Sequence, residues 1–297
     1  MSAMHEEAAV LMAYGSPERV ADVPAYYADI RGGRPVSPER VRDLVARYRA
    51  LGIEDANPLN AITEATRAAL QEELGLPVYT GMRHWQPRIA DAVDAALAAG
   101  AGRLVGLVLA PHYSRLSIGG YRQLFDEAVA GRVPVAFVES WHDEPGFVAF
   151  LAGRVRGTGA HVVFTAHSLP ARIVDEGDPY RDQLHETARL VAEEAGIDDW
   201  TFSFQSESPT GEPWLGPDIL DHLDDLAARG VRHVLVCPVG FVSDHLEIRW
   251  DLDHEAQDRA RELGMALERI AMPNDDPAFV RVLGDIVRRH LTPVAAA

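Results

Sequence analysis

The chain has 297 residues, a formal net charge of −17 at pH 7 and 47% hydrophobic residues, which is enough to build the buried cores of two domains. The sequence contains no lysine, so its 28 basic residues are all arginine, which excludes lysine Schiff-base chemistry and a Walker-type phosphate loop. The negative charge argues against a nucleic-acid partner. Cys237 is the single cysteine, which excludes an internal disulfide and a four-cysteine iron–sulfur cluster.

Hydropathy gives no sign of a membrane segment. No apolar run approaches the roughly 20 residues that a membrane-spanning helix needs, and no signal peptide is visible. We therefore expect no integral membrane segment and a cytoplasmic location.

Two halves of the chain repeat the same series of motifs. The apolar run 8–13 leads to Tyr14-Gly-Ser-Pro, and the run 161–166 leads to His167-Ser-Leu-Pro. Further apolar runs follow at 103–110 and 232–239, and Asp-Glu-Pro-Gly-Phe-Val at 143–148 returns as Asp-Asp-Pro-Ala-Phe-Val at 275–280. Each half therefore predicts, in chain order, a strand, helices, a strand, a helix, two strands and a helix.

The predicted strands are short, continuous apolar runs. Such runs are typical of parallel sheets that helices cover on both faces, so the sequence predicts an α/β architecture. The repeat predicts two similar domains, residues 1–152 and residues 153–297, with the boundary near Gly153, Gly157 and Gly159. The last helix is free to pack across this boundary.

Polar residues follow the predicted strands, at the ends where ligands bind in open α/β sheets. They are Tyr14, His84, His112 and His142 in the first half, and His167, Gln205, Asp244, His245, Glu247 and Asn274 in the second. A single histidine in such a place is more often a helix cap or a satisfied surface group. Several imidazoles and carboxylates from both halves favour a shared site, and without thiolate they suit a divalent metal such as Fe²⁺.

The segment 240–255 carries the strongest signal for a site. If it is helical from about Asp244, then Glu247, Asp251 and Glu255 stand four residues apart and form an acidic ridge about 12 Å long. Stacked carboxylates repel one another, so the ridge favours a role in binding or moving a cation, either a hydrated divalent metal or protons. The alternative is a solvated acidic face on an acidic chain.

Motifs along nearly the whole chain, from about Val10 to His290, resemble the ferrochelatase family. They are Ala13–Pro17, Thr165–Pro170, Gln205-Ser206, Pro213–Asp218 and Pro238–Glu247. Tyr14, with Arg31 after it, resembles the coproporphyrin III ferrochelatases of Gram-positive bacteria more than the protoporphyrin enzymes. The resemblance implies two Rossmann-like chelatase domains, each with a parallel four-stranded sheet flanked by helices, and an active-site cleft between them.

The resemblance also implies a reaction. The expected enzyme inserts Fe²⁺ into coproporphyrin III and releases two protons, giving Fe-coproporphyrin (coproheme) in haem biosynthesis. Fe²⁺ is then a substrate, and neither a tightly bound cofactor nor an iron–sulfur cluster is expected. We expect a monomer whose partners are coproporphyrin III, Fe²⁺ and, transiently, neighbouring enzymes of the haem pathway. The alternatives are a chelatase for another tetrapyrrole or metal (protoporphyrin IX with Fe²⁺, or cobalt and a corrinoid precursor) and a non-catalytic haem or porphyrin carrier.

Individual residues receive roles from the same resemblance. His167 and Glu247 would be the catalytic pair that holds the metal and handles protons, with Asp251 and Glu255 as an outer acidic line. Tyr14 would bind the porphyrin and approach its iron as an axial ligand, from the face opposite the histidine. The other expected contacts with the porphyrin and its propionates are Arg31, Arg47, Tyr48, Asn57 and Tyr121. An unperturbed imidazole titrates near pH ~6.5, which suits His167 as a proton acceptor.

Overall fold

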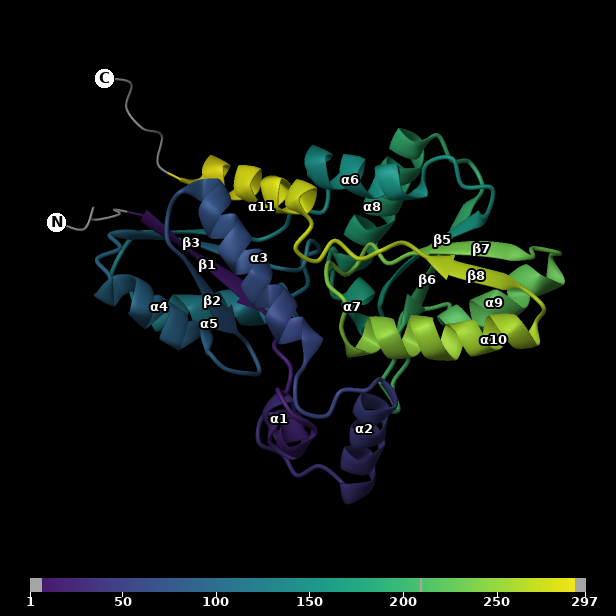
Figure 1. The fold of residues 1–297 in the computed structure, drawn as a ribbon, viewed down its shortest axis with the longest axis horizontal. Coiled ribbons are helices and arrows are strands. Elements are labelled where there is room, and N and C mark those ends of the chain that lie inside the picture. The colour runs from purple at the N-terminus through teal and green to yellow at the C-terminus, as the bar shows by residue number, and fades with distance from the viewer. Residues whose placement is uncertain (1–6, 209, 292–297) are drawn as a thin grey trace. The chain divides into compact units, whose positions relative to one another are not determined.

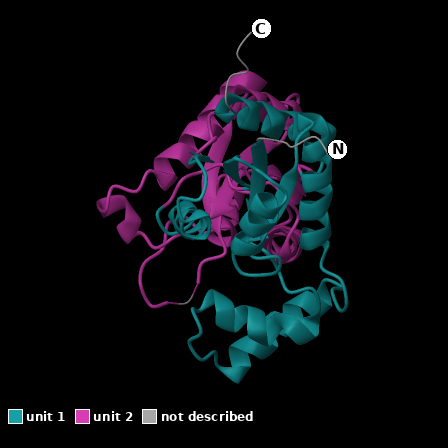
Figure 2. Ribbon diagram, turned by 90° about the vertical axis from the view of Figure 1, so that its left-hand side faces the viewer, with its two compact units in different colours: residues 1–109, 115–139, 274–297 teal, residues 110–114, 140–273 magenta. Residues whose placement is uncertain are grey.

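A computed structural model describes residues 7–208 and 210–291 of the chain. Within them, the chain forms two compact units (Figure 2). Unit 1 takes in the described parts of 1–109, 115–139 and 274–297, and unit 2 takes in 110–114 and 140–273. The boundary predicted at residues 152 and 153 lies inside helix α6 (Pro145–Val155), which packs on α8 (Tyr180–Ala195) of unit 2. The last helix, α11 (Pro277–His290), belongs to unit 1, where it packs on α3 (Pro58–Leu74).

Unit 1 is built on a parallel sheet with the strand order β2-β1-β3-β4 (Figure 1). Its strands are β1 (Glu7–Ala13), β2 (Val78–Met82), β3 (Arg103–Val108) and β4 (Val135–Val138). Helices α4 (Ile89–Ala98) and α5 (Ile118–Val129) pack together on one face, and α3 and α11 pack together on the other. Both faces are therefore covered, which explains why β1 is buried along almost its whole length. Unit 1 also contains η1 (Val20–Asp22), α1 (Val23–Ile30) and α2 (Pro38–Ala50).

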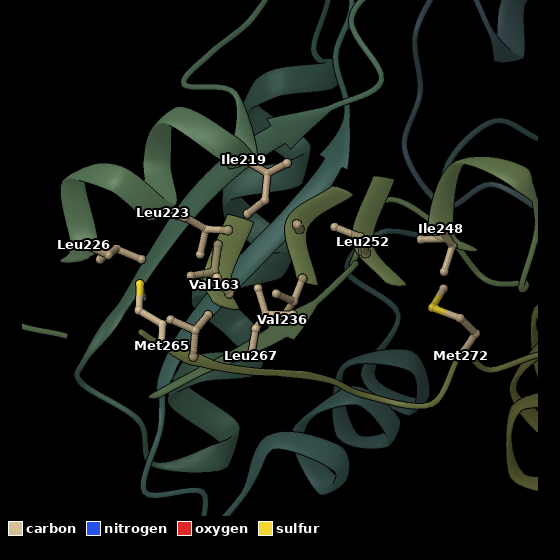
Figure 3. Packing of buried hydrophobic residues seen from close by; sticks show 13 residues of the cluster. Val163, Ile219, Leu223, Leu226, Val236, Ile248, Leu252, Met265, Leu267 and Met272 are labelled. Carbon is tan, nitrogen blue, oxygen red and sulfur yellow. The ribbon is translucent and has the colours of Figure 1, made fainter. Parts of the chain in front are cut away.

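Unit 2 repeats this sheet with the order β6-β5-β7-β8. Its strands are β5 (His161–His167), β6 (Trp200–Gln205), β7 (His233–Cys237) and β8 (Ala266–Arg269). Its further helices are α7 (Arg172–Asp175), α9 (Ile219–Ala228), η2 (Ile248–Ala256) and α10 (Gln257–Glu262). Figure 3 shows one side of the core, where Leu223 of α9 and Leu252 of η2 pack on Val163 and Val236 of the sheet. Full burial of such an aliphatic side chain stabilises the fold by roughly 1.5–3 kcal/mol.

The two sheets confirm the predicted fold class and the internal repeat. In each sheet, the first strand of the unit lies between the second and the third, and all pairings are parallel. The chain therefore leaves β1 and β5 at equivalent places. Tyr14 directly follows β1, and His167 is the last residue of β5.

Several helices begin at a polar residue followed by proline. Ser37, Asn57 and Asp276 stand immediately before α2, α3 and α11, and each side chain accepts a hydrogen bond from a backbone N–H of the first turn. These bonds satisfy donors that the helix itself leaves unpaired, and proline at the next position has no N–H to satisfy. The sequence thus sets these three helix starts locally. In the two described stretches, no helix is long and apolar enough to span a bilayer.

Candidate active site

The centre of the candidate site in unit 2 is a contact between His167 and Glu247. The carboxyl end of β5 places His167, whose Nε2 lies 3.5 Å from Oε1 of Glu247. On the other side of the ring, Nδ1 contacts the carbonyl oxygen of Ser168. Gly240, which follows β7, lets the chain pass close to β5, because a Cβ at this position would lie 2.5 Å from the Cβ of Ala166. The strand end and this close crossing bring the two functional groups together.

The electrostatics of this pair favour a proton on the imidazole. Burial alone would lower the pKa of His167, but the Glu247 carboxylate, the Ser168 carbonyl and Asp251 outweigh it and raise the pKa to about 9. Burial would likewise raise the pKa of Glu247, and the neighbouring imidazoles of His167 and His245 outweigh that effect and lower it. At neutral pH the pair is therefore an imidazolium facing a carboxylate. This differs from the sequence expectation of an imidazole that titrates near pH ~6.5.

His245 is a second imidazole beside Glu247. Its Nε2 lies 3.4 Å from Oε2 of Glu247, and its Nδ1 lies 2.9 Å from the carbonyl oxygen of Ser243. The carboxylate thus lies between two histidines. The sequence places His245 beyond a strand and indicates no role for it. The available signal was its place two residues before Glu247, in Asp-His-Leu-Glu.

Asp251 and Glu255 of the acidic ridge lie on a π-helix and not on the expected α-helix, and Glu247 directly precedes this π-helix. The backbone N–H groups of η2 donate to carbonyls five residues earlier in the chain. Such helices are rare in proteins, and many of those that occur lie at functional sites. Asp251 is 7% exposed, and its carboxylate accepts a hydrogen bond from Ser206. Glu255 is partly buried and accepts one from Nε1 of Trp250 at 2.7 Å. A solvated acidic face is therefore a poor description of Asp251, which is buried and hydrogen-bonded.

The protein groups near His167 leave room in a metal coordination shell. Within residues 7–208 and 210–291, no three His, Cys, Asp or Glu side chains are arranged to hold a metal ion together. His167 and Glu247 by themselves supply an imidazole nitrogen and a carboxylate oxygen, which suit a borderline divalent ion. Such an ion would keep water or take ligands from another molecule.

In unit 1, Tyr14 presents a phenol at the end of β1. Tyr14 is 43% exposed, which is unusual for a large aromatic residue, and its ring centre lies 4.6 Å from that of His84. His84 is held in turn by Asp29, 2.8 Å from its Nδ1. The next residue, Gly15, has φ +82°, and a Cβ there would lie 2.7 Å from the Cβ of Trp85. Glycine is therefore required at the turn that presents Tyr14.

The predicted porphyrin contacts of unit 1 fall into exposed and buried groups. Arg31, at the end of α1, and Arg47, on α2, are both exposed. Tyr121 is 3% exposed, and burial raises the pKa of its phenol although the Arg83 guanidinium lies 5.3 Å from its ring centre. The two arginines are thus accessible to a ligand, whereas Tyr121 is buried.

Tyr48 and Asn57 belong to an internal hydrogen-bond network. Tyr48 is 2% exposed, and its hydroxyl lies 2.9 Å from Oγ of Ser16. Asn57 donates from Nδ2 to Oγ of Ser16 at 2.7 Å and to the carbonyl of Pro17 at 3.1 Å, while its Oδ1 caps α3. The donors that Asn57 offers are already in use, so a propionate would have to replace one of these bonds. The network accounts for both residues as supports of the turn after Tyr14.

Comparisons with known proteins agree along the chain. The sequence pattern of the family described as ferrochelatase matches residues 6–291. A ferrochelatase of Herpetosiphon aurantiacus is 44% identical over 94% of this chain and 97% of its own length. The coproporphyrin III ferrochelatase of Bacillus subtilis is 39% identical over 95% of this chain and 97% of its own. The solved structure of SirB from Bacillus subtilis with Fe³⁺ is similar in fold, with a TM-score of 0.64 at 11% identity over 96% of each chain.

Proposed function

Because the chain belongs to the ferrochelatases, a family of metal-inserting enzymes that act on porphyrins, we propose that it inserts Fe²⁺ into coproporphyrin III and releases two protons. The product is Fe-coproporphyrin, and Fe²⁺ is a substrate, so the proposal includes no resident cofactor. The choice of porphyrin is supported by the exposed Tyr14 and by the name of the Bacillus subtilis relative. The Herpetosiphon relative carries the broader name, so protoporphyrin IX is the alternative substrate.

The His167–Glu247 pair is the observation that carries the proposal. Metal insertion must remove two N–H protons from the ring and replace the water around Fe²⁺ with pyrrole nitrogens. A carboxylate with a lowered pKa next to an imidazolium attracts the cation, and it stays ionised at neutral pH. His167 starts with a proton of its own, so it must pass that proton on before it can accept one from a pyrrole. Glu247 neighbours the imidazole and, in this scheme, relays its proton onward to solvent, because the lowered pKa of its carboxyl prevents it from keeping the proton.

Anaerobic incubation with Fe²⁺ tests the proposal directly. The purified protein is mixed separately with coproporphyrin III and protoporphyrin IX, and the porphyrin absorbance is followed with time. We expect insertion into coproporphyrin III to be the faster reaction. Insertion into protoporphyrin IX alone would refute the substrate, and binding without insertion of any metal, including cobalt into a corrinoid precursor, would favour a carrier.

Tyr14→Phe should change the absorption spectrum of the bound product while metal insertion stays measurable. The substitution removes only the phenolic oxygen, and the exposed ring of Tyr14 is where unit 1 could supply an axial ligand. The ring and its contact with His84 would persist in the variant, so the fold should be unchanged. Identical spectra for the product complexes of both proteins would remove Tyr14 from the ligands of the porphyrin iron.

Arg31→Ala and Arg47→Ala should weaken the binding of coproporphyrin III more than the binding of protoporphyrin IX, which has fewer propionates. Both side chains are exposed, so we expect each change to raise the Kd roughly fivefold and not by the larger factor of a dry ion pair. Porphyrin fluorescence quenching measures both affinities, with Arg281→Ala on α11 as a control for lost charge. Equal losses for the two porphyrins would place these arginines away from the additional propionates.

A further inference from the structure

Positive charge is concentrated in one short segment of this acidic protein. Residues 31–49 contain six arginines and two acidic residues, which gives this segment a net charge of +4. The rest of the chain carries −21, and the two add up to the total of −17. An acidic protein repels a polyanion at long range, whereas a local positive lobe can attract it and raise its association rate. We call the six side chains the arginine face; they are Arg31, Arg34, Arg40, Arg42, Arg47 and Arg49.

The arginine face is exposed, and three of its six side chains are uncompensated among the described residues. All six residues are exposed. The side chains of Arg31, Arg34 and Arg42 form no hydrogen bond or ion pair with any part of the chain that the structure describes. Of the other three, Arg49 lies 3.2 Å from Glu54, and Arg40 and Arg47 also have interaction partners. The charge of Arg31, Arg34 and Arg42 is therefore available to a ligand.

The fold does not need these side chains for its own packing. Helix α2 buries only Tyr48, whose hydroxyl reaches Ser16, and Ser37 caps the helix at its other end. In Figure 1, α1 and α2 lie apart from the sheet of unit 1. A helix pair that is held at its base by these contacts presents its outward arginines to solvent, and their cost or benefit for folding is small.

We propose that the arginine face steers the carboxylate groups of the free porphyrin substrate to unit 1 before the porphyrin is bound. This inference rests on the proposed function, since it takes coproporphyrin III as the ligand. Arg34 and Arg42 act on the encounter and not on the bound state, in contrast to the contact roles predicted for Arg31 and Arg47. The Debye length is about 8 Å at physiological ionic strength, so the attraction acts close to the helix pair and weakens with salt.

Stopped-flow fluorescence of coproporphyrin III binding tests the steering. Arg34→Gln/Arg42→Gln should lower the association rate constant about three- to tenfold at low salt, and the difference should vanish near 0.5 M salt (roughly a 4 Å Debye length). The dissociation rate constant and the kcat at saturating porphyrin should stay as in the wild type. Arg229→Gln/Arg281→Gln is the matched control, because it removes two exposed arginines outside the arginine face.

Four results would overturn the steering. The control variant could slow association equally, or the Arg34→Gln/Arg42→Gln variant could associate at the wild-type rate or change only the dissociation rate constant. The fourth result is arginine-dependent binding to anionic lipid vesicles with unchanged porphyrin association. The proposed function is judged separately. Iron insertion together with salt-independent association refutes the steering alone. Salt-dependent, arginine-dependent association without iron insertion supports the steering and refutes the proposed activity.

Discussion

Glu247→Gln should reduce the turnover of metal insertion by about a hundredfold or more while porphyrin binding is retained. The amide keeps the shape of the side chain but can neither attract Fe²⁺ as an anion nor accept a proton. The substitution also removes the largest influence that raises the pKa of His167, so the imidazole should become neutral at lower pH. Initial rates with coproporphyrin III and Fe²⁺, together with porphyrin fluorescence quenching, measure the two effects separately.

Asp251→Asn and Glu255→Gln are the graded companions of this variant. Both should do less than Glu247→Gln, chiefly by raising the Fe²⁺ concentration needed for half-maximal rate, because the carboxylate 3.5 Å from Nε2 of His167 is that of Glu247. Asp251 is buried against Ser206, so its variant needs a thermal melt to separate a loss of stability from a loss of rate. Wild-type turnover in all three neutral variants would mean that the acidic residues are structural and that the proposed mechanism is wrong.

His167→Ala should abolish insertion and leave the fold intact. His167 ends a strand, and its side chain is 29% exposed, so the core loses little when the ring is removed. The loss should appear in kcat, since the ring is the proposed holder of the metal and of the proton. Circular dichroism checks the fold. A folded His167→Ala protein with wild-type turnover would contradict the assignment of this residue.

The same variant tests the charge state of the pair through the pH dependence of stability. The pKa of His167 in the folded protein is raised to about 9, against ~6.5 in the unfolded chain. Its pairing with Glu247 therefore stabilises the native state fully below pH ~6.5, and this stabilisation is lost as the pH rises through about 9. The free energy of unfolding of the wild type minus that of His167→Ala should therefore fall between these two pH values. Denaturant unfolding of the metal-free proteins measures it. A difference that stays constant over this range would show that His167 carries no extra proton.

Much of the fold could be predicted from the sequence, because strands covered on both faces must be apolar throughout. The runs at 8–13 and 161–166 became β1 and β5, and the repeated motifs gave two sheets of the same order. The pairing of His167 with Glu247 was accessible as well, since both follow strands of one parallel sheet. These features depend on short-range patterns that one sequence contains.

The remaining features depend on contacts that no local pattern encodes. Carboxylates four residues apart fit an α-helix or a π-helix equally well, so the spacing could not reveal η2. Asn57 and Tyr48 meet at Ser16, which lies 41 and 32 residues earlier in the chain. The sequence could not show that these distant polar residues bond to one another, and their predicted contact with the porphyrin stays a prediction. The raised pKa of His167 is likewise a product of assembled neighbours.

The return of α11 to unit 1 has a consequence for synthesis on the ribosome. Phe279, Leu283 and Val287 of this helix are fully buried, and Arg288 pairs with Glu73 of α3 at 2.6 Å. The ribosome makes these residues only after the whole of unit 2. Domains generally fold in the order in which they emerge, but the first unit of this chain must wait with one apolar face of its sheet covered by α3 alone. Nascent chains that end before α11 should therefore expose part of this face and depend on chaperones, although unit 2 is already complete.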